Sequence, residues 1–560
     1  MAAFARALKD LNPDPTGRRW LYVPYDQLSD KIGPLSRWPA DETGIVVVEN
    51  RWKAARRPYH KQKLALVLAN MRHFALEQAR RGVAVRFVAG AAPYRELLAP
   101  IIDELGTMTM MRPAERELRM DLAPLVASGR LEEIEHEGWL TDRQTFEQAM
   151  KGKLPWRMDA FYRAVRQQTG LLMEDGKPLG GKYSHDADNR QPWSGQPKAA
   201  EPPVFEPDEV TQEVGDLIRR AFEVHPGQLD LTMLPATAAD AERLWSWARQ
   251  DCLPRFGPYE DAMSVRSTTI FHTRVSPLVN LHRLLPSRLV ADAAKAKLPL
   301  SSQEGFIRQV IGWREFMHHV HEQTDGFRRL PAAPDVTHTR AEPGDGGYES
   351  WSGIRWEPPE SPELDGGAAP SFLGDDRPVP TAFWGQASGL ACLDRVVADV
   401  WREAYSHHIT RLMVLGNLGT LLGLSPRDLA DWFWCAYADA YDWVVEPNVM
   451  GMAMFGLGPL FVTKPYVSGA AYIDKMSDYC GDCRFHPKKT CPVTPMYWAF
   501  LGRHEPKLAD NPRMKLILAS LRKRGDAQRA VDARVYGAVV ESLSAGKPLS
   551  ATIVKDAQKQ

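Results

Sequence analysis

The chain has 560 residues, of which 44% are hydrophobic and 25% charged, enough for at least two domains that each bury a core. Lys and Arg together number 70, as do Asp and Glu, so a nucleic-acid-binding surface would have to be a local basic patch. No signal peptide opens the chain and no apolar run is long enough to span a bilayer, which with only six cysteines predicts a cytoplasmic protein.

The first 140 residues alternate between predicted strands and helices. Residues 20–28 (WLYVPYDQL) and 44–50 (GIVVVEN) are typical of buried strands, residues 60–82 of an amphipathic helix, and residues 83–90 of a third strand. Strands separated by helices form parallel sheets with right-handed crossovers. We therefore expect a Rossmann-like α/β domain over residues 1–140, with any ligand near the loops that follow the strands.

The rest of the chain divides into a connector and a long helical region. Residues 141–207 contain a polar, glycine-bearing run (175–193) that predicts an interdomain connector. From residue 208 to residue 560 the pattern is helical, which predicts an all-α domain. One interruption, residues 334–380, is rich in Pro, Gly and acidic residues and is expected to be a flexible insertion, because it has too few apolar residues to fold alone.

Four cysteines have the spacing of metal ligands. Cys480, Cys483 and Cys491 lie close together in the run YCGDCRFHPKKTC, and Cys392 lies far upstream in GLACLDR. Thiolates at such spacing hold either a structural zinc ion or an iron–sulfur cluster. Spacing alone favours neither, and in a zinc site His486 could replace one of the sulfurs.

Two segments of the helical region have the character of ligand-binding sites. In residues 271–280 (FHTRVSPLVN), Thr273 and Ser276 could hold a diphosphate at the start of a helix, although Ser or Thr there is more often an ordinary cap. In residues 306–316 (FIRQVIGWREF), Trp313 and Arg314 could stack on and pair with a ligand. A buried Trp beside a salt bridge is the commoner meaning of that pair.

Two further segments carry titratable groups. Residues 404–417 (AYSHHITRLMVLGN) contain adjacent histidines, His407 and His408, with Arg411 one turn later. Neighbouring helical residues point in different directions, so we expect at most one of the two histidines to face a site shared with Arg411. Such a histidine could act as an acid, or be an ordinary core residue. Asp439 stands in an apolar, aromatic segment, where a carboxylate needs a partner.

Taken together, these motifs resemble those of the cryptochrome/photolyase family, and among its members the bacterial branch that carries an iron–sulfur cluster, the prokaryotic (6-4) photolyases and iron–sulfur cryptochromes. The resemblance implies an α/β antenna domain followed by an all-helical domain that holds FAD. It extends over nearly the whole chain, in residues 26–28, 59–64, 70–75, 180–190, 272–280, 306–316, 382–397, 405–417, 438–448 and 491–501.

The resemblance also implies which residues bind the cofactors. Cys392, Cys480, Cys483 and Cys491 match the ligands of a 4Fe–4S cluster, although the last two are closer together here than is usual in the family. The residues that match the FAD site are His272, Thr273, Ser276, Leu278, Asn280, Trp313, Arg314, Arg411 and Asp439. Val445 stands where the family often has a Glu near flavin N5 and the acid is displaced to Glu446, so flavin protonation or semiquinone stability would differ from that of relatives.

The activity implied is blue-light-driven repair of UV-damaged DNA. Reduced FAD would donate an electron to a (6-4) pyrimidine–pyrimidone photoproduct that is flipped out of the duplex. His408 matches the histidine that supplies a proton to the lesion, and Tyr466 matches a tyrosine on the lesion side. A blue-light-sensing cryptochrome with little or no repair is the alternative within the family, and a zinc-stapled DNA-binding protein is the alternative outside it.

The remaining residues implied by the resemblance serve light harvesting, electron transfer and DNA binding. A 6,7-dimethyl-8-ribityllumazine antenna would use Asp26, Gln27 and Glu49 at strand ends. Flavin photoreduction would use an aromatic relay that contains Trp384 and Trp432, with Tyr441 as a further candidate, whereas Phe433 replaces the tyrosine of some relatives and cannot be oxidised in its place. The residues expected to contact DNA are Lys182 and Arg190. The protein is expected to be a monomer. Residues 513–525 are a second basic surface or an ordinary solvated helix face.

Overall fold

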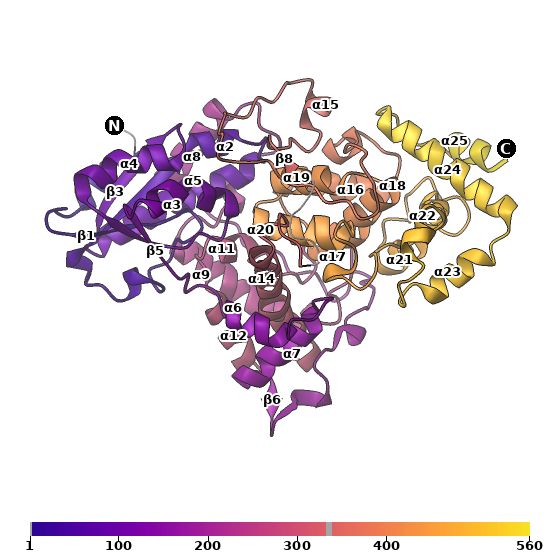
Figure 1. Ribbon diagram of the computed structural model, residues 1–560, viewed down its shortest axis with the longest axis horizontal. Helices are drawn as coiled ribbons and strands as arrows, with labels where there is room; N and C mark the ends of the chain where they lie inside the picture. The colour runs from indigo at the N-terminus through magenta and orange to yellow at the C-terminus, as the bar shows by residue number, and fades with distance from the viewer. Residues whose placement is uncertain (1–2, 332–338, 560) are drawn as a thin grey trace.

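The computed structural model describes residues 3–331 and 339–559 (Figure 1). The N-terminal part contains one sheet of five parallel strands in the order β3-β2-β1-β4-β5. This architecture confirms the predicted α/β fold class. The strands are β1 (Arg19–Tyr22), β2 (Thr43–Asn50), β3 (Ala84–Gly90), β4 (Met108–Met111) and β5 (Leu131–Ile134).

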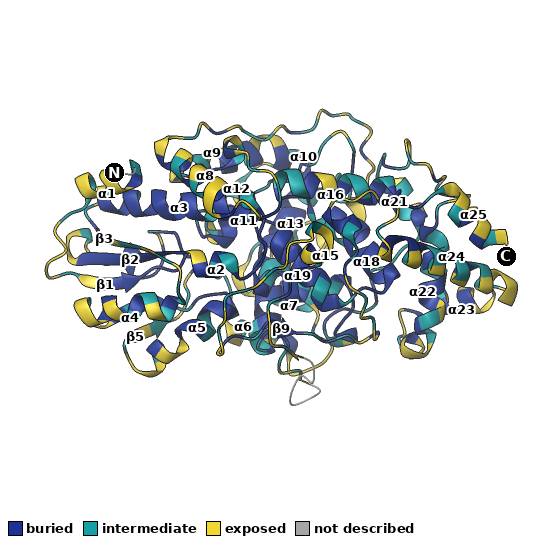
Figure 2. Ribbon diagram, turned by 90° about the horizontal axis from the view of Figure 1, so that it is seen from above, coloured by how far each residue is buried: buried dark blue, intermediate teal, exposed yellow. Residues whose placement is uncertain are grey.

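Helices cover both faces of this sheet. Strand β2 is buried at all eight positions, which explains why its sequence is an almost unbroken apolar run rather than an alternating one. Helix α3 (Lys61–Arg80) lies on one face, with α1 (Ala3–Leu11) and α8 (Glu209–Ala221) packed against it, and α4 (Tyr94–Leu105) and α5 (Arg116–Ala127) lie on the other. Figure 2 shows β1, β2 and α3 mostly buried between more exposed outer elements.

The expected connector contains regular structure of its own. Helices α6 (Arg143–Met150) and α7 (Met158–Thr169) pack against each other and against the helical domain, because Phe146 and Phe161 bury aromatic rings between them. A short hairpin, β6 (Met173–Glu174) and β7 (Lys177–Pro178), projects at the lower edge of Figure 1. Residues 182–207 then run to α8 without a long helix or strand.

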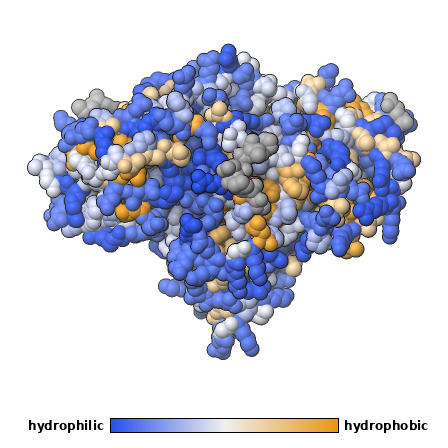
Figure 3. Space-filling view, in the orientation of Figure 1, coloured by the Kyte–Doolittle hydropathy of each residue, from blue (hydrophilic) through white to orange (hydrophobic). Residues whose placement is uncertain are grey.

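The C-terminal region is helical, as predicted, and within its described residues four π-helical turns interrupt the helices, at residues 248–252, 308–314, 411–416 and 446–453. Such turns are rare and often occur at functional sites. No helix of the described residues is both long and apolar enough to cross a membrane, and the face in Figure 3 is largely hydrophilic. The main helices are α9 (Ala238–Trp247), α10 (Leu253–Phe256), α11 (Ser276–Asn280), α12 (Pro286–Lys295), α13 (Leu300–Ile307), α14 (Glu315–Gln323), α16 (Ala391–Glu403), α17 (His408–Thr410), α18 (Asn417–Leu422), α19 (Pro426–Ala436), α20 (Asp442–Val445), α21 (Ala470–Met476), α22 (Val493–Leu508), α23 (Lys515–Arg522), α24 (Asp526–Ser544) and α25 (Ala551–Lys559).

The described part of the expected flexible insertion is anchored to the helical domain, while residues 334–338 of it lie outside the described residues. Strands β8 (Thr339–Arg340) and β9 (Gly367–Ala368) pair with each other, and α15 (Tyr348–Ser352) lies between them in sequence. Gly346 has a φ of +63°, and a Cβ there would come within 2.5 Å of the Trp432 backbone. At Gly346, therefore, the glycine allows the insertion to pack closely on α19 and is not a sign of flexibility.

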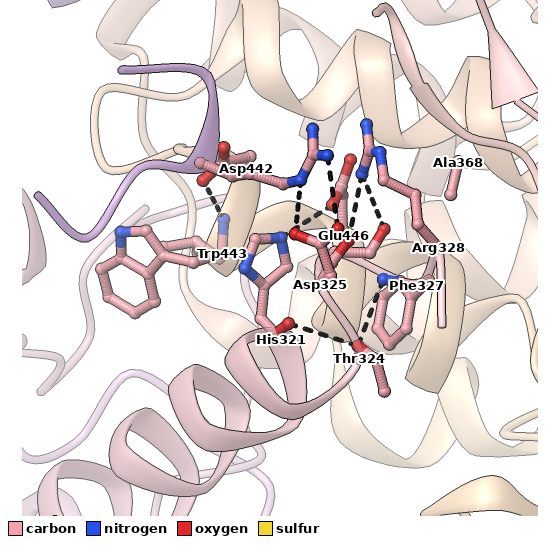
Figure 4. Close-up of polar contacts among 12 residues, drawn as sticks. His321, Thr324, Asp325, Phe327, Arg328, Ala368, Asp442, Trp443 and Glu446 are labelled. Atoms are coloured by element: carbon pink, nitrogen blue, oxygen red, sulfur yellow. Dashed lines mark hydrogen bonds and ion pairs between the residues drawn. The ribbon is translucent and has the colours of Figure 1, made fainter. Parts of the chain in front are cut away.

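A buried network of charged groups joins this insertion and both domains (Figure 4). Glu446 accepts a hydrogen bond from Arg427 at 2.7 Å and lies 2.8 Å from the Nε2 atom of His321 at the end of α14. Arg427 also donates to the carbonyl oxygen of Ala368 in β9. Asp442, one turn before Glu446, accepts from the backbone N–H of Glu117 in α5 at 3.1 Å. Three separate parts of the chain therefore meet at residues 442–446.

We expect Glu446→Gln to lower the free energy of unfolding at pH 7 by about 3–5 kcal/mol, the usual effect of removing one partner from a buried ion pair. Burial opposes ionisation, but the hydrogen bond with His321 and the charge of Arg427 lower the pKa of Glu446 to about 2. The contribution therefore exists above about pH 4.3, the pKa of an unfolded glutamate, and is lost as the pH falls towards 2. Melting temperatures of the two proteins should converge over that interval.

Glu209→Gln is the matched control for this experiment. It removes an ion pair with Arg6 whose side chains are 83% and 58% exposed, so the melting temperature should barely change at any pH. A difference between wild type and Glu446→Gln that stays constant down to about pH 3 would contradict the assigned role of the ionised carboxylate.

Candidate functional site

A cavity of about 310 Å³ lies within the helical domain. Three of the four π-helical turns, at residues 308–314, 411–416 and 446–453, contribute side chains to its wall, together with the start of α11 and the end of α19. Leu278 lies instead on a neighbouring cavity of about 430 Å³, because positions 276 and 280 share one face of α11 and position 278 faces the other way. The expected residues that line the 310 Å³ cavity are His272, Thr273, Ser276, Asn280, Trp313, Arg314, His408, Arg411 and Asp439.

Asp439 has the partner that its apolar surroundings require. Its two carboxylate oxygens lie 2.9 and 3.0 Å from the two terminal nitrogens of Arg411, a bidentate pair. The hydroxyl of Ser276 donates to the same carboxylate at 2.6 Å, and the amide of Asn280 donates to the Asp439 carbonyl at 2.8 Å. Although burial opposes ionisation, Arg411 and Ser276 together lower the pKa of Asp439. The cavity wall thus carries a fixed cation beside a fixed anion.

Three histidines form one cluster on this wall, and both His407 and His408 line the cavity, contrary to the expectation that at most one would. His407 has extended backbone and precedes α17, so the helical rule for neighbouring side chains does not apply to it. Its ring stacks on that of His272 with centroids 4.2 Å apart, and the His408 ring lies 5.4 Å from His272. Burial and the neighbouring histidines lower the pKa of His272 and His407 well below its usual range.

An acidic residue that the sequence reading missed lies close to His408. Burial raises the pKa of Asp261, and the nearby His408 is the largest influence in the opposite direction. The Tyr472 hydroxyl donates to Asp261 at 3.1 Å, and Arg190 from the connector lies 3.7 Å from it. Tyr466 is half-buried, and the charge of Arg190 opposes the rise in its pKa that burial causes. A lone acid in the run GPYEDAM has no sequence signature, so only the fold reveals this neighbourhood.

The displaced acid of the WVVEP run points away from the cavity. Val445 lines the cavity wall, whereas Glu446 begins the next turn and enters the buried network of Figure 4. Asn448, three residues after Val445, also lines the cavity. The wall is therefore apolar at position 445, and its nearest polar group on the same helical face is a neutral amide.

Aromatic rings form a continuous path from the cavity to the surface. Phe433 lines the cavity and lies 5.1 Å from Trp432 between ring centroids. Trp401, which the sequence reading did not single out, connects Trp432 at 5.9 Å to Trp384 at 4.6 Å. Trp384 stacks on Trp351 at 5.6 Å, and Trp351 is 41% exposed. The two expected tryptophans, Trp384 and Trp432, are thus connected through Trp401.

The four expected cysteine ligands lie near one another. All are free thiols, and burial together with the other three thiols raises the pKa of Cys392 well above its usual range. Cys392 lies in the first turn of α16, and the other three flank a loop before α22. His486 is exposed and accepts a hydrogen bond from the backbone N–H of Lys488, so it does not join them. No three His, Cys, Asp or Glu side chains of the described residues converge as ligands of a single ion.

The residues expected to hold an antenna are engaged elsewhere. Glu49 forms a bidentate ion pair with Arg72, and Gln27 donates to two backbone carbonyls. Asp26 keeps one buried oxygen without a partner, and burial raises its pKa to about 7. Close to these residues lies a cavity of only about 60 Å³, and Tyr441 belongs to its wall rather than to the aromatic path. The wall also includes Tyr25, Asn50, Lys53, Tyr59, Lys63, Tyr94, Glu115 and Trp434.

Comparisons with known proteins agree with this geometry. A family model described as deoxyribodipyrimidine photo-lyase-related protein matches residues 21–233. The chain is 33% identical over 508 residues to a (6-4) photolyase of Agrobacterium fabrum, which covers 87% of this chain and 92% of that protein. A bacterial class III photolyase from Agrobacterium tumefaciens shares the fold at 15% identity, with a TM-score of 0.51 over 97% of this chain and 99% of the other. A cryptochrome of Synechocystis does so at 13% identity, with a TM-score of 0.50 over 97% and 98% of the two chains.

Proposed function

The chain belongs to the cryptochrome/photolyase family, and we propose that it is a (6-4) photolyase, a light-driven lyase that restores (6-4) pyrimidine–pyrimidone photoproducts in UV-damaged DNA. The observation that carries this proposal is the single cavity that brings His408 together with the Arg411–Asp439 pair. The identity of 33% to a (6-4) photolyase over most of both chains supports the same activity. We further propose that it acts as a monomer in the cytoplasm, where its six free thiols would stay reduced.

The residues of the 310 Å³ cavity fit FAD, which would supply light absorption and electron transfer. Buried nitrogens without partners face it, among them Nε2 of His272, Nδ1 of His407 and Nη2 of Arg314. Arg411 and Asp439 would flank the flavin ring. Because Ser276 already donates to Asp439, Thr273 and the backbone N–H groups at the start of α11 are the groups left for the phosphates.

We assign to His408 the role of proton donor to the lesion. It lines the cavity wall, and Asp261 lies near it. Tyr466 would contact the flipped base from the lesion side, and Lys182 and Arg190 would bind phosphates beside it, since both are exposed on the connector. His408 would give its proton, or a strong hydrogen bond, to the hydroxyl that moves between the two bases of the photoproduct.

The test is repair of a defined oligonucleotide that contains one (6-4) photoproduct under blue light, with product separated by chromatography. Fully reduced wild type should restore the parent bases. His408→Ala should retain FAD and lose about 10²-fold or more in repair rate, the usual contribution of a general acid. Repair by His408→Ala at the wild-type rate would overturn the assigned role of His408. If the wild type shows no turnover, the proposal of a photolyase is wrong and the light-sensing cryptochrome becomes the favoured function.

We also propose that flavin photoreduction uses the path Trp432, Trp401, Trp384 and Trp351. Phe433 cannot be oxidised in place of a tyrosine, but Tyr437 stacks on it at 5.1 Å and lies 4.0 Å from the Arg411 guanidinium. Tyr437 is therefore the oxidisable ring that accompanies Trp432 near the cavity, while Tyr441 lies on another cavity.

Trp401→Phe is expected to slow photoreduction of the bound flavin, because it removes the only oxidisable ring that links Trp432 to Trp384 among the contacts of the described residues. Absorbance in the blue, followed under illumination with a thiol reductant, measures the rate. Trp498→Phe, which changes a tryptophan near the C-terminal helices, should leave the rate unchanged. Equal rates for the two variants would remove Trp401 from the path.

For the cysteines we propose a 4Fe–4S cluster held by Cys392, Cys480, Cys483 and Cys491. The four thiols lie near one another and the exposed His486 does not join them, which supports a site made of four sulfurs. Bound there, the cluster would tie α16 to the segment before α22. It would thereby brace the helix that leads to His408.

Cys392→Ser should remove the brown visible absorption and most of the bound iron, whereas His486→Ala should change neither. The exposed His486 is the matched control, since it is the one alternative ligand in the loop. Zinc in place of iron in the purified wild type, or loss of metal in His486→Ala, would refute the cluster assignment.

The antenna proposal gains no support from the residues present. A pocket for a small molecule usually has about 300 Å³ or more, and the cavity near Asp26 has about 60 Å³. Lys53 and Lys63 fill the space, held by Glu115 and by the carbonyl oxygens of Trp434 and Ala440. A ribityllumazine does not fit this arrangement, and no step of the mechanism is assigned to it.

A further inference from the structure

The amphipathic helix α23 and its flanking residues form a basic surface on the helical domain. Residues 513–525 contain five Lys or Arg and no Asp or Glu. Arg522 and Arg524 are paired with Glu505 and Asp532, whereas Arg513, Lys515 and Lys523 have no acidic partner within the described residues. Met514, Leu518 and Leu521 are buried, so the helix holds its basic face outward.

Leu516 breaks the polar character of that outward face. It is 85% exposed, more than any other large hydrophobic side chain of the described residues, the next being Val204 at 66%. Lys515 precedes Leu516, and Arg513 lies one turn earlier on the same face. An exposed Leu516 beside Arg513 and Lys515 is suited to bind a polyanion that has an apolar gap between its charged groups.

The start of α23 lies next to the proposed lesion site. Asn511 donates from its side-chain amide to the Thr463 carbonyl at 2.9 Å, which fixes it on the loop that carries Tyr466. Burial and Asp186 raise the pKa of Tyr466, while the charges of Arg190 and Arg513 oppose them, so both basic elements are near this tyrosine. In Figure 1 the β6 hairpin of the connector is at the lowest point of the molecule, and α23 is at the lower right of the helical domain.

We propose that α23 is a second DNA-binding element, in which Leu516 enters the gap left in the duplex by the flipped lesion while Arg513 and Lys515 bind the flanking phosphates. The inference rests on the proposed function and extends it to the undamaged part of the substrate. Flipping removes one base from the stack and leaves an apolar slot, and proteins that bend DNA fill such slots with Leu, Ile or Phe. The connector and α23 then hold phosphates at two points around the cavity mouth.

Leu516→Gln tests this directly because the residue is exposed and the substitution leaves the helix core intact. We expect about tenfold weaker binding to a duplex with one (6-4) photoproduct and unchanged binding to the same lesion in single-stranded DNA, which has no gap to fill. Lys515→Gln should reduce the slope of log affinity against log salt by about 0.9. Val224→Gln, in the turn after α8, and Lys555→Gln on α25 are the matched controls for apolar exposure and for charge.

The outcomes separate this inference from the proposed function. If wild type binds and repairs the lesion but Leu516→Gln binds the duplex equally well, only the inference is overturned. If wild type neither binds nor repairs the lesion in either form, the proposed function fails first. A change of oligomeric state in Leu516→Gln, measured by light scattering, with unchanged DNA affinity would assign the leucine to contact with a second copy of the chain and overturn the inference.

Discussion

Burial of three carboxylates within eight residues is the constraint around which the rest of the structure is arranged. Asp439, Asp442 and Glu446 are almost fully buried, and an unpaired buried charge is far too costly to tolerate. Each therefore has its partner in a different direction: Arg411 at the cavity, the backbone of α5 in the α/β domain, and Arg427 with His321 in the core. This short segment consequently joins the two domains and one wall of the cavity.

The same arrangement determines what faces the cavity. Because Asp442 and Glu446 have their partners away from the cavity, residues 442–453 present Val445 and Asn448 to the space that we assign to the flavin, beside the Arg411–Asp439 pair. The wall also carries His272 and His407, which are neutral because burial lowers the pKa of each. Positive charge on the wall comes from Arg411, which is held by Asp439, from Arg274, which is held by Glu403, and from Arg314, which lies against the Trp139 and Trp443 rings. These groups are pre-positioned, so binding a charged cofactor requires little reorganisation.

Function is distributed over segments that are remote in sequence. The aromatic path leads from Phe433 to Trp351, which lies in the proline- and glycine-rich insertion, so that segment contributes a surface terminus rather than a passive loop. The proposed cluster would brace α16 on another side, and the groups that we propose to contact DNA come from the connector and α23.

Local patterns in the sequence were sufficient for the α/β fold class, the helical domain, the buried strand β2 and several polar residues of the cavity wall, because periodicity and short motifs are properties of neighbouring residues. The resemblance that the sequence carries also named the cysteines and His408. Only the tertiary structure showed that both His407 and His408 face the cavity, that Leu278 does not, and that Trp401 links Trp384 to Trp432. The tertiary structure also showed that Asp261 lies near His408 and that Glu49 and Gln27 bind other partners. These outcomes depend on which distant segments come into contact, and contacts between distant segments cannot be predicted from local sequence patterns.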